Sequence, residues 1–89
     1  MIQKIYSIRL TKDAEKSLLK INQSIPVIGR KISKNIESLK THPYLGIKLQ
    51  GADQETRRIR VGDYRIIYEV YENELLIIVV YVGTRGGAY

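Results

Sequence analysis

Apolar and polar residues alternate from position 57 to position 71, and this period of two predicts β-strands. In the first arm, Ile59 and Val61 lie on one face, and Arg58 and Arg60 lie on the other. In the second arm one face consists of Tyr64, Ile66, Tyr68 and Val70, and the opposite face of Arg65, Ile67 and Glu69. Gly62, which is free to adopt positive φ, and Asp63 indicate a tight turn between the arms. The pattern therefore predicts a β-hairpin with one apolar face and one arginine-bearing face.

The first part of the chain predicts a strand and a helix. Alternation over residues 2–10 indicates the strand. Thr11 is a suitable N-cap for the helix that follows, and Asp13 lies in the first turn, where a carboxylate complements the positive end. Apolar residues recur along one stripe of this helix at Ala14, Leu18 and Ile21. We expect the helix to end at Asn22 and Gln23.

A second helix is predicted between Ser24, a plausible N-cap, and Pro43, which disfavours helical geometry in the residue before it. Pro26 is tolerated in the first turn, and Gly29 weakens the helix slightly. The apolar stripe of this helix consists of Ile25, Ile28, Ile32, Ile36 and Leu39. We interpret the stripe as core, with the two helices forming an antiparallel pair packed on the sheet.

The remaining segments predict a loop, a turn and a final strand. Residues 41–54 contain two glycines and one proline, and we expect a loop there. Residues 72–74 indicate a turn, and residues 75–82 indicate a strand that is apolar on both faces, as expected of a central strand covered on both sides. The predicted order is β-α-α-β-β-β, an α+β fold with a helix hairpin packed on a small, mostly antiparallel twisted sheet. A chain of 89 residues corresponds to a single domain, 1–89.

Charge and composition restrict the partners. The 15 lysine and arginine residues outnumber the 9 acidic residues, and the net charge of +6 favours an anionic partner, either a nucleic acid or an acidic protein. The chain has no cysteine and one histidine, so we expect neither a disulfide nor a metal site. The first residues lack the apolar core of a signal peptide, and no apolar run reaches the ~20 residues of a membrane helix. We therefore expect a cytoplasmic protein that uses no cofactor and does not bind a membrane.

Three blocks of the sequence resemble one family of proteins. They are Lys48-Leu49-Gln50-Gly51, the stretch R-I-R-V-G-D-Y-R-I-I-Y-E-V at positions 58–70, and Val82-Gly83-Thr84-Arg85 with a terminal Tyr89. Together they are similar to the RelE/ParE superfamily of bacterial toxins, and more narrowly to its RelE branch of messenger-RNA endonucleases. The resemblance implies a type II toxin–antitoxin toxin that inhibits translation by cleaving messenger RNA in the ribosomal A site, through metal-independent attack of the 2′-hydroxyl. It also implies three partners, which are a cognate antitoxin, the ribosome and RNA.

The resemblance further implies roles for individual residues. Arg65 and Arg85 match the phosphate-binding arginines of the family, and arginine is well suited to stabilising charge that builds on a phosphate. Tyr89 matches a C-terminal tyrosine that orients or activates the nucleophile. Arg58 and Arg60 match a basic pair in which the family usually has lysine, and Arg60 is included among the catalytic candidates. The side chains expected to contact RNA are Lys48, Arg57 and Arg58.

The identity of the general base stays open at this point. Tyr89 either takes part in proton transfer or only anchors the end of the chain. Glu69 shares a face with Arg65 and is a second candidate, and an ion pair between the two is its simpler interpretation. His42 is a third candidate, and plain exposure in a loop is its simpler interpretation. Many members of the family have a histidine where Thr84 stands, and a threonine hydroxyl does not replace an imidazole.

Two other functions also stay open. One is a toxin of the ParE branch, which poisons DNA gyrase and cleaves no RNA. The other is a family member that only binds its antitoxin. The sequence of residues 85–89 favours the endonuclease, because ParE-like members generally lack the arginine and tyrosine found there.

Overall fold

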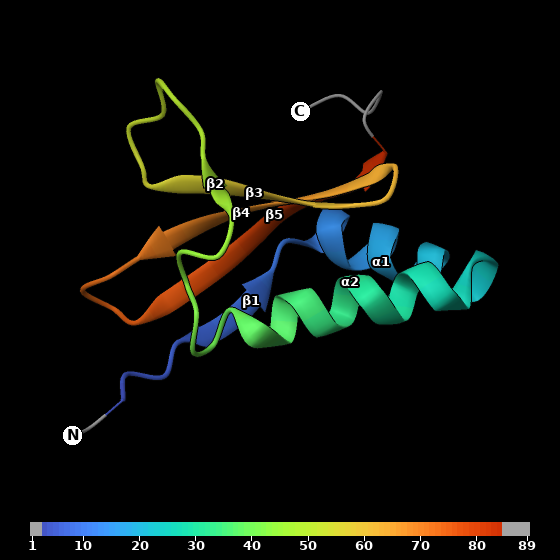
Figure 1. The fold of residues 1–89 in the computed structure, drawn as a ribbon, viewed down its shortest axis with the longest axis horizontal. Helices are drawn as coiled ribbons and strands as arrows, with labels where there is room; N and C mark the ends of the chain where they lie inside the picture. Colours follow the sequence, from blue (N-terminus) through green and yellow to red (C-terminus); the bar gives the residue numbers. More distant parts are fainter. Residues whose placement is uncertain (1–2, 85–89) are drawn as a thin grey trace.

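The computed structural model describes residues 3–84, which form two helices on one face of a five-stranded sheet (Figure 1). The elements in chain order are β1 (Ser7–Leu10), α1 (Lys12–Ser24), α2 (Pro26–Ser38), β2 (Ile47–Lys48), β3 (Thr56–Val61), β4 (Tyr64–Tyr71) and β5 (Leu76–Thr84). The strands lie in the order β1-β5-β4-β3-β2, with β1 parallel to β5 and the other neighbours antiparallel. The predicted α+β class and the mostly antiparallel sheet are therefore confirmed.

The first helix begins where the sequence predicts. The Thr11 side chain accepts a hydrogen bond from the backbone N–H of Ala14 at 3.2 Å, and the acidic residues Asp13 and Glu15 occupy the first turn. These contacts satisfy one of the free N–H groups at the helix start and complement its positive end. Thr11 is therefore confirmed as the N-cap.

The second helix differs from its predicted bounds at both ends. Ser24 is the last residue of α1 rather than the cap of α2, whose N-cap position is occupied by Ile25 without a side-chain hydrogen bond. The helix ends at Ser38 instead of continuing towards Pro43. It stops early because the chain turns there, and the carbonyl of Lys40 accepts a hydrogen bond from Tyr6 at 2.8 Å. The Lys40 carbonyl is thus satisfied by Tyr6, the residue before β1, and not by a continuing helix.

Gly29 lies at the contact between the two helices, so its small size matters more than its weak helix propensity. A Cβ atom at this position would lie 2.9 Å from the Cα atom of Asn22 in α1. We expect Gly29→Ala to destabilise the fold by about 1–3 kcal/mol, although alanine is the better helix former. Urea unfolding measures this, with the exposed Ser33→Ala as the control in the same helix. A Gly29→Ala variant as stable as the control would show that the helices are free to separate.

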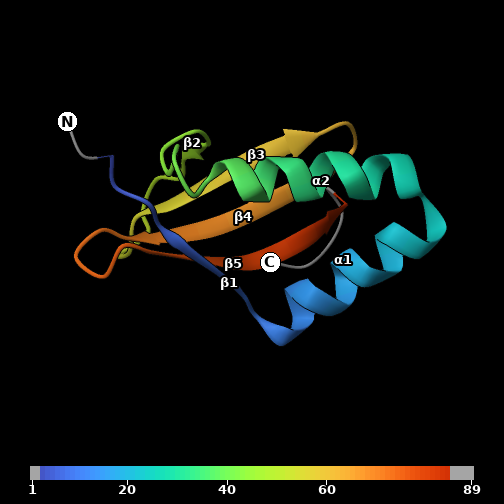
Figure 2. The ribbon, with the colours of Figure 1, turned by 90° about the horizontal axis from the view of Figure 1, so that it is seen from below.

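The core lies between the helices and one face of the sheet, and Figure 2 shows both helices on that same side. The predicted apolar faces of the hairpin are confirmed, because Ile59, Ile66 and Tyr68 all belong to the core. The helices contribute Ala14, Ile21, Ile32 and Ile36, with Leu39 after the end of α2. The other face of the sheet carries no helix in the described part of the chain, and it is called the open face below.

Three predictions about the sheet are wrong. Residues 41–54 do not form a loop throughout, because Ile47 and Lys48 pair with β3 as the edge strand β2. The last strand is central, between β1 and β4, but within residues 3–84 helices cover only one of its faces. The first strand is also shorter than predicted, since β1 begins at Ser7. The turn at Gly62 is confirmed, with a φ of +60°.

A register shift between β4 and β5 brings both Val79 and Val82 of the last strand into the core. Ile67 pairs with Tyr81 while its neighbour Tyr68 pairs with Val79, so Val80 is an extra residue in β5. The bulge reverses the alternation of the strand, because both Val79 and Val82 reach the core although they are an odd number of residues apart. Tyr81 is thereby placed beside Ile67 on the open face.

Candidate nucleic-acid interface

Three arginines of the hairpin gather on the open face of the sheet. Arg60 pairs directly with Arg65 across β3 and β4, and Arg58 pairs with Ile67. Because side chains two residues apart in a strand share a face, Arg58 and Arg60 are neighbours along β3. The alternation of the sequence predicts this arrangement. Arg58, Arg60 and Arg65 are called the arginine cluster below.

Within residues 3–84 the arginine cluster has no carboxylate partner. The ion pairs of this part of the chain join Lys40 to Glu37 and join both Lys48 and Arg57 to Glu55. In the cluster, the Nε atoms of Arg58 and Arg65 are buried without a hydrogen-bond partner. A buried donor without a partner costs free energy, and like charges directly opposite each other in a sheet are destabilising. The cluster is therefore an arrangement that an anion would stabilise.

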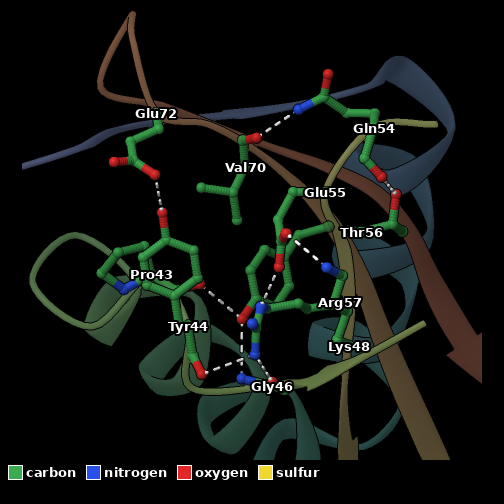
Figure 3. Close-up of polar contacts among 11 residues, drawn as sticks. Pro43, Tyr44, Gly46, Lys48, Gln54, Glu55, Thr56, Arg57, Val70 and Glu72 are labelled. Atoms are coloured by element: carbon green, nitrogen blue, oxygen red, sulfur yellow. Dashed lines mark hydrogen bonds and ion pairs between the residues drawn. The ribbon is translucent and has the colours of Figure 1, made fainter. Parts of the chain in front are cut away.

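Arg57 lies on the other side of the sheet from the cluster. It pairs with the core residue Tyr68, and its guanidinium donates to Glu55 at 2.7 Å and to the carbonyl of Gly46 at 2.7 Å (Figure 3). The same guanidinium lies 5.0 Å from the centre of the Tyr44 ring, a cation–π contact. The structure thus does not bring Arg57 together with the three arginines of the cluster, although the sequence grouped all four.

Lys48 belongs to the same separate network. Its Nζ atom lies 3.4 Å from the carboxylate of Glu55. Burial alone would raise the pKa of Glu55, but the hydrogen bond from Arg57 and the charges of Lys48 and Arg57 outweigh it and hold that pKa below its ordinary value. Glu55 therefore remains ionised and ties β2 to β3.

Tyr68 and Gly46 hold the segment before β2 in place, and neither was among the residues predicted to be functional. The buried Tyr68 hydroxyl donates to the carbonyl of Pro43 and accepts from the N–H of Gly46, both at 2.9 Å (Figure 3). A Cβ atom at Gly46 would lie 2.7 Å from the carbonyl oxygen of Arg58, so only glycine fits there. The position of Tyr68 on the apolar face of β4 could have indicated these contacts, because a buried hydroxyl needs hydrogen-bond partners.

Glu69 does not form the predicted ion pair with Arg65. Its carboxylate accepts a hydrogen bond from the Tyr71 hydroxyl at 2.7 Å. Since a strand rises ~3.3 Å per residue, Glu69 and Arg65 are roughly 13 Å apart along β4. Glu69 instead lies towards the turn between β4 and β5, where a pocket of about 570 Å³ is lined by residues that include Glu55, Glu72 and Glu74. The two ends of the hairpin thus differ in charge.

A steric constraint explains why the block at positions 82–85 has a glycine, Gly83. Gly83 pairs with Arg65, and a Cβ atom there would lie 2.7 Å from the hydroxyl oxygen of Tyr81. The Tyr81 hydroxyl donates to the carbonyl of Thr84 at 2.9 Å, so the ring lies close to the Gly83 backbone. Two of the predicted catalytic residues, Arg85 and Tyr89, lie outside the described residues.

His42 and the carboxylates of residues 3–84 do not form a metal site. His42 lies in the segment between α2 and β2, and its Nδ1 atom is 3.0 Å from the exposed hydroxyl of Thr41. No group of three histidine, cysteine or carboxylate side chains in this part of the chain is placed to hold a metal ion. Neither of the two helices found there is long and apolar enough to cross a membrane.

Three tyrosines predict how stability depends on pH. A hydrogen bond to Glu72 raises the pKa of Tyr44, burial raises that of Tyr68, and a hydrogen bond to Glu69 raises that of Tyr71. Above the ordinary pKa of 10.0 the unfolded chain loses these protons while the folded chain retains them. The stabilisation is therefore fully present below pH 10 and is lost as the pH rises further.

Urea unfolding at several pH values between about 9 and 11 tests this. The free energy of unfolding should fall across that range, and the fall should be shallower in a variant with both Tyr44→Phe and Tyr71→Phe. Because lysines titrate in the same range, the comparison between wild type and variant is the decisive one. Identical slopes would show that the two surface hydroxyls do not contribute.

Comparisons with known proteins agree with the fold and identify the family. Residues 8–89 match the family model described as the ParE toxin of the type II toxin–antitoxin system parDE. The RelE1 protein of Methanocaldococcus jannaschii is 35% identical over 83 residues, which cover 86% of this chain and 91% of that protein. The toxin in the crystal structure of the RelE–RelB complex of Pyrococcus horikoshii is 30% identical with a TM-score of 0.76, covering 94% of this chain and 99% of that one.

A more distantly related toxin of known structure has the same fold. The isolated RelE toxin of Escherichia coli is 22% identical, has a TM-score of 0.71, and matches over 93% of this chain and 87% of its own. At that identity the likeness concerns the fold alone. The family model and the archaeal relatives together show that this chain belongs to the RelE/ParE superfamily of type II toxin–antitoxin toxins.

Proposed function

We propose that this toxin inhibits translation by cleaving messenger RNA on the ribosome, through metal-independent attack of the 2′-hydroxyl on the adjacent phosphate. The observation that carries the proposal is the arginine cluster, whose members have no carboxylate partner among residues 3–84. Arginine presents a planar set of donors to phosphate oxygens and stays charged at every physiological pH. The resemblance of the sequence to the RelE branch supplies the substrate and the ribosome.

The cluster would act on the charge that builds on the phosphate. As the 2′-oxygen approaches phosphorus, negative charge increases on the non-bridging oxygens, and donors already in place stabilise it most. The Nε atoms of Arg65 and Arg58 are buried, and an N–H donor shielded from water interacts more strongly with that charge than an exposed one. The attack forms a bond between the 2′-oxygen and phosphorus and breaks the bond to the 5′-oxygen, which leaves a 2′,3′-cyclic phosphate and a 5′-hydroxyl. The 2′-hydroxyl must lose a proton and the leaving 5′-oxygen must gain one. Arginine is a poor proton carrier, so these two transfers require another group. A substrate oriented by the ribosome lowers the demand on that group.

An antitoxin is the second partner of this proposal. The archaeal relative of known structure was crystallised as a RelE–RelB complex. The present chain carries a net charge of +6, which favours a partner with an acidic surface. An antitoxin that covers the arginine cluster would satisfy its donors and would block RNA at the same time. We propose that inhibition works in this way.

The test is addition of the purified toxin to ribosomes programmed with a defined message, followed by mapping of messenger-RNA 5′ ends. New ends within the A-site codon, seen without added metal and absent when ribosomes are omitted, are the expected result. Intact message at toxin concentrations that arrest growth in cells would overturn the proposal.

Gyrase poisoning is a second candidate, because the family model that matches residues 8–89 is described as a ParE toxin. A DNA supercoiling assay with purified gyrase, run in parallel, separates the two candidates. Inhibited supercoiling with intact message would favour gyrase as the target. Unaffected supercoiling with a cleaved message would exclude it.

A further inference from the structure

Arg58 is flanked by isoleucines on the open face. Strand pairing places Ile47 of β2 on one side of it and Ile67 of β4 on the other, and Tyr81 of β5 follows in the same row. Ile67 is 4% exposed, but Ile47 is 64% exposed at the edge of the sheet. The buried Nε atom of Arg58 thus lies next to an apolar side chain that remains open to a ligand.

The position of Ile47 is fixed by several contacts. The carbonyl of the preceding Gly46 accepts a hydrogen bond from Arg57, and its N–H donates to Tyr68 (Figure 3). The following Lys48 forms an ion pair with Glu55. Polar contacts on both sides therefore hold a two-residue strand at the sheet edge. Such a strand is a rigid support for an exposed isoleucine.

We propose that Ile47 contacts a nucleobase of the RNA strand whose phosphate binds Arg58. This inference rests on the proposed function and names a second part of the same site. Directly paired residues of antiparallel strands lie ~4.5–5.5 Å apart at Cα, so a nucleotide with its phosphate at Arg58 reaches Ile47 with its base. The flat face of a base is weakly hydrated and gains by contact with an apolar side chain.

A nucleobase fits this place better than an acidic protein segment. The site offers one cationic group and one exposed apolar group side by side, with no further basic residue paired to β2 on the open face. Nucleotides alternate a phosphate with a base at about this spacing. An acidic side chain would satisfy Arg58 but would leave Ile47 exposed.

The experiment compares two probes that differ only in their bases. One is a short single-stranded 2′-O-methyl RNA, which resists attack by the 2′-oxygen, and the other is its abasic counterpart with the same number of phosphates. We expect Ile47→Ser to weaken binding of the first probe by about threefold to tenfold and to leave the abasic probe unchanged. Ile47→Leu, which keeps the apolar surface, should bind like wild type.

Two controls separate this inference from the proposed function. Leu19→Ser removes an exposed leucine of α1, 58% exposed, and should change neither affinity. Arg58→Gln should weaken both probes, because it removes a phosphate contact. If it weakens neither, the RNA-binding face itself is misassigned and both proposals fall.

The remaining outcomes concern Ile47 alone. If Arg58→Gln weakens both probes while Ile47→Ser weakens neither, the nucleobase contact is overturned and the phosphate site stands. If Ile47→Ser weakens both probes equally, Ile47 only shields Arg58 from water, and the nucleobase contact is again overturned. Equal urea midpoints for Ile47→Ser and wild type are required, so that a difference in folding does not mimic the effect.

Discussion

Replacing Arg65 by glutamine is expected to lower the rate of messenger-RNA cleavage by roughly 10²–10³-fold, the effect of removing one preorganised donor from a developing oxyanion. Glutamine retains a polar side chain with N–H donors, but it is shorter than arginine and carries no charge. The variant should fold at least as stably as wild type, because Arg65 has a buried Nε without a partner and lies opposite Arg60. Removing one of two facing like charges relieves a repulsion.

Single-turnover cleavage on programmed ribosomes measures the rate, and urea unfolding measures the stability. Arg30→Gln is the matched control, since Arg30 is an exposed arginine of α2, on the other side of the molecule from the open face. It reduces the net charge equally and should leave cleavage within about twofold. Equal rates for Arg65→Gln and wild type would remove the arginine cluster from the mechanism.

Replacing Tyr89 by phenylalanine is expected to lower cleavage by roughly 10²–10⁴-fold, the usual contribution of a group that transfers a proton. Phenylalanine keeps nearly all of the apolar area, so a tyrosine that only anchors the chain would tolerate the change. Binding to the ribosome should hardly change, because the arginines supply the phosphate contacts. Glu69, another candidate for the general base, is hydrogen-bonded to Tyr71 and lies far along β4 from Arg65, which disfavours it in that role.

The measurement compares Tyr89→Phe with Glu69→Gln and His42→Gln under single-turnover conditions, with ribosome binding measured alongside. We expect the last two variants to cleave at the wild-type rate. A Tyr89→Phe variant with full activity would contradict the assignment, and loss of activity in Glu69→Gln or His42→Gln would name the base instead. Loss of binding together with cleavage would support an anchoring role for the Tyr89 hydroxyl.

Local signals account for the features that could be predicted from the sequence. The turn at Gly62 and the cap at Thr11 depend on neighbouring residues only, and both are confirmed. The faces of β3 and β4 follow from alternation, which placed Arg58 and Arg60 correctly opposite the core face. The same alternation assigns Arg57 to the core side of β3. Arg57 was grouped with Arg58 and Arg60 only because it is also an arginine.

The features that were missed depend on contacts between distant segments. The strand β2 exists because the Tyr68 hydroxyl and the Arg57 guanidinium bind the segment before it. Neither contact leaves a periodic pattern near Ile47. The bulge at Val80 is likewise invisible in an unbroken apolar run, where every register buries valine or isoleucine. For the candidate site, therefore, the arginines were predictable but the apolar group beside Arg58 was not.

The uneven charge of the β3–β4 hairpin has a kinetic consequence. Arg60 and Arg65 lie near one end of it, whereas Glu69 and the Glu72 and Glu74 carboxylates lie towards the other. Such a separation gives the hairpin an electric dipole in addition to the net charge of the chain, although Asp63 at the arginine end reduces it. The field of a polyanion exerts a torque on this dipole and turns the arginine end towards the polyanion before contact. Productive encounters then form a larger share of collisions at low ionic strength, and this advantage fades as added salt shortens the screening length.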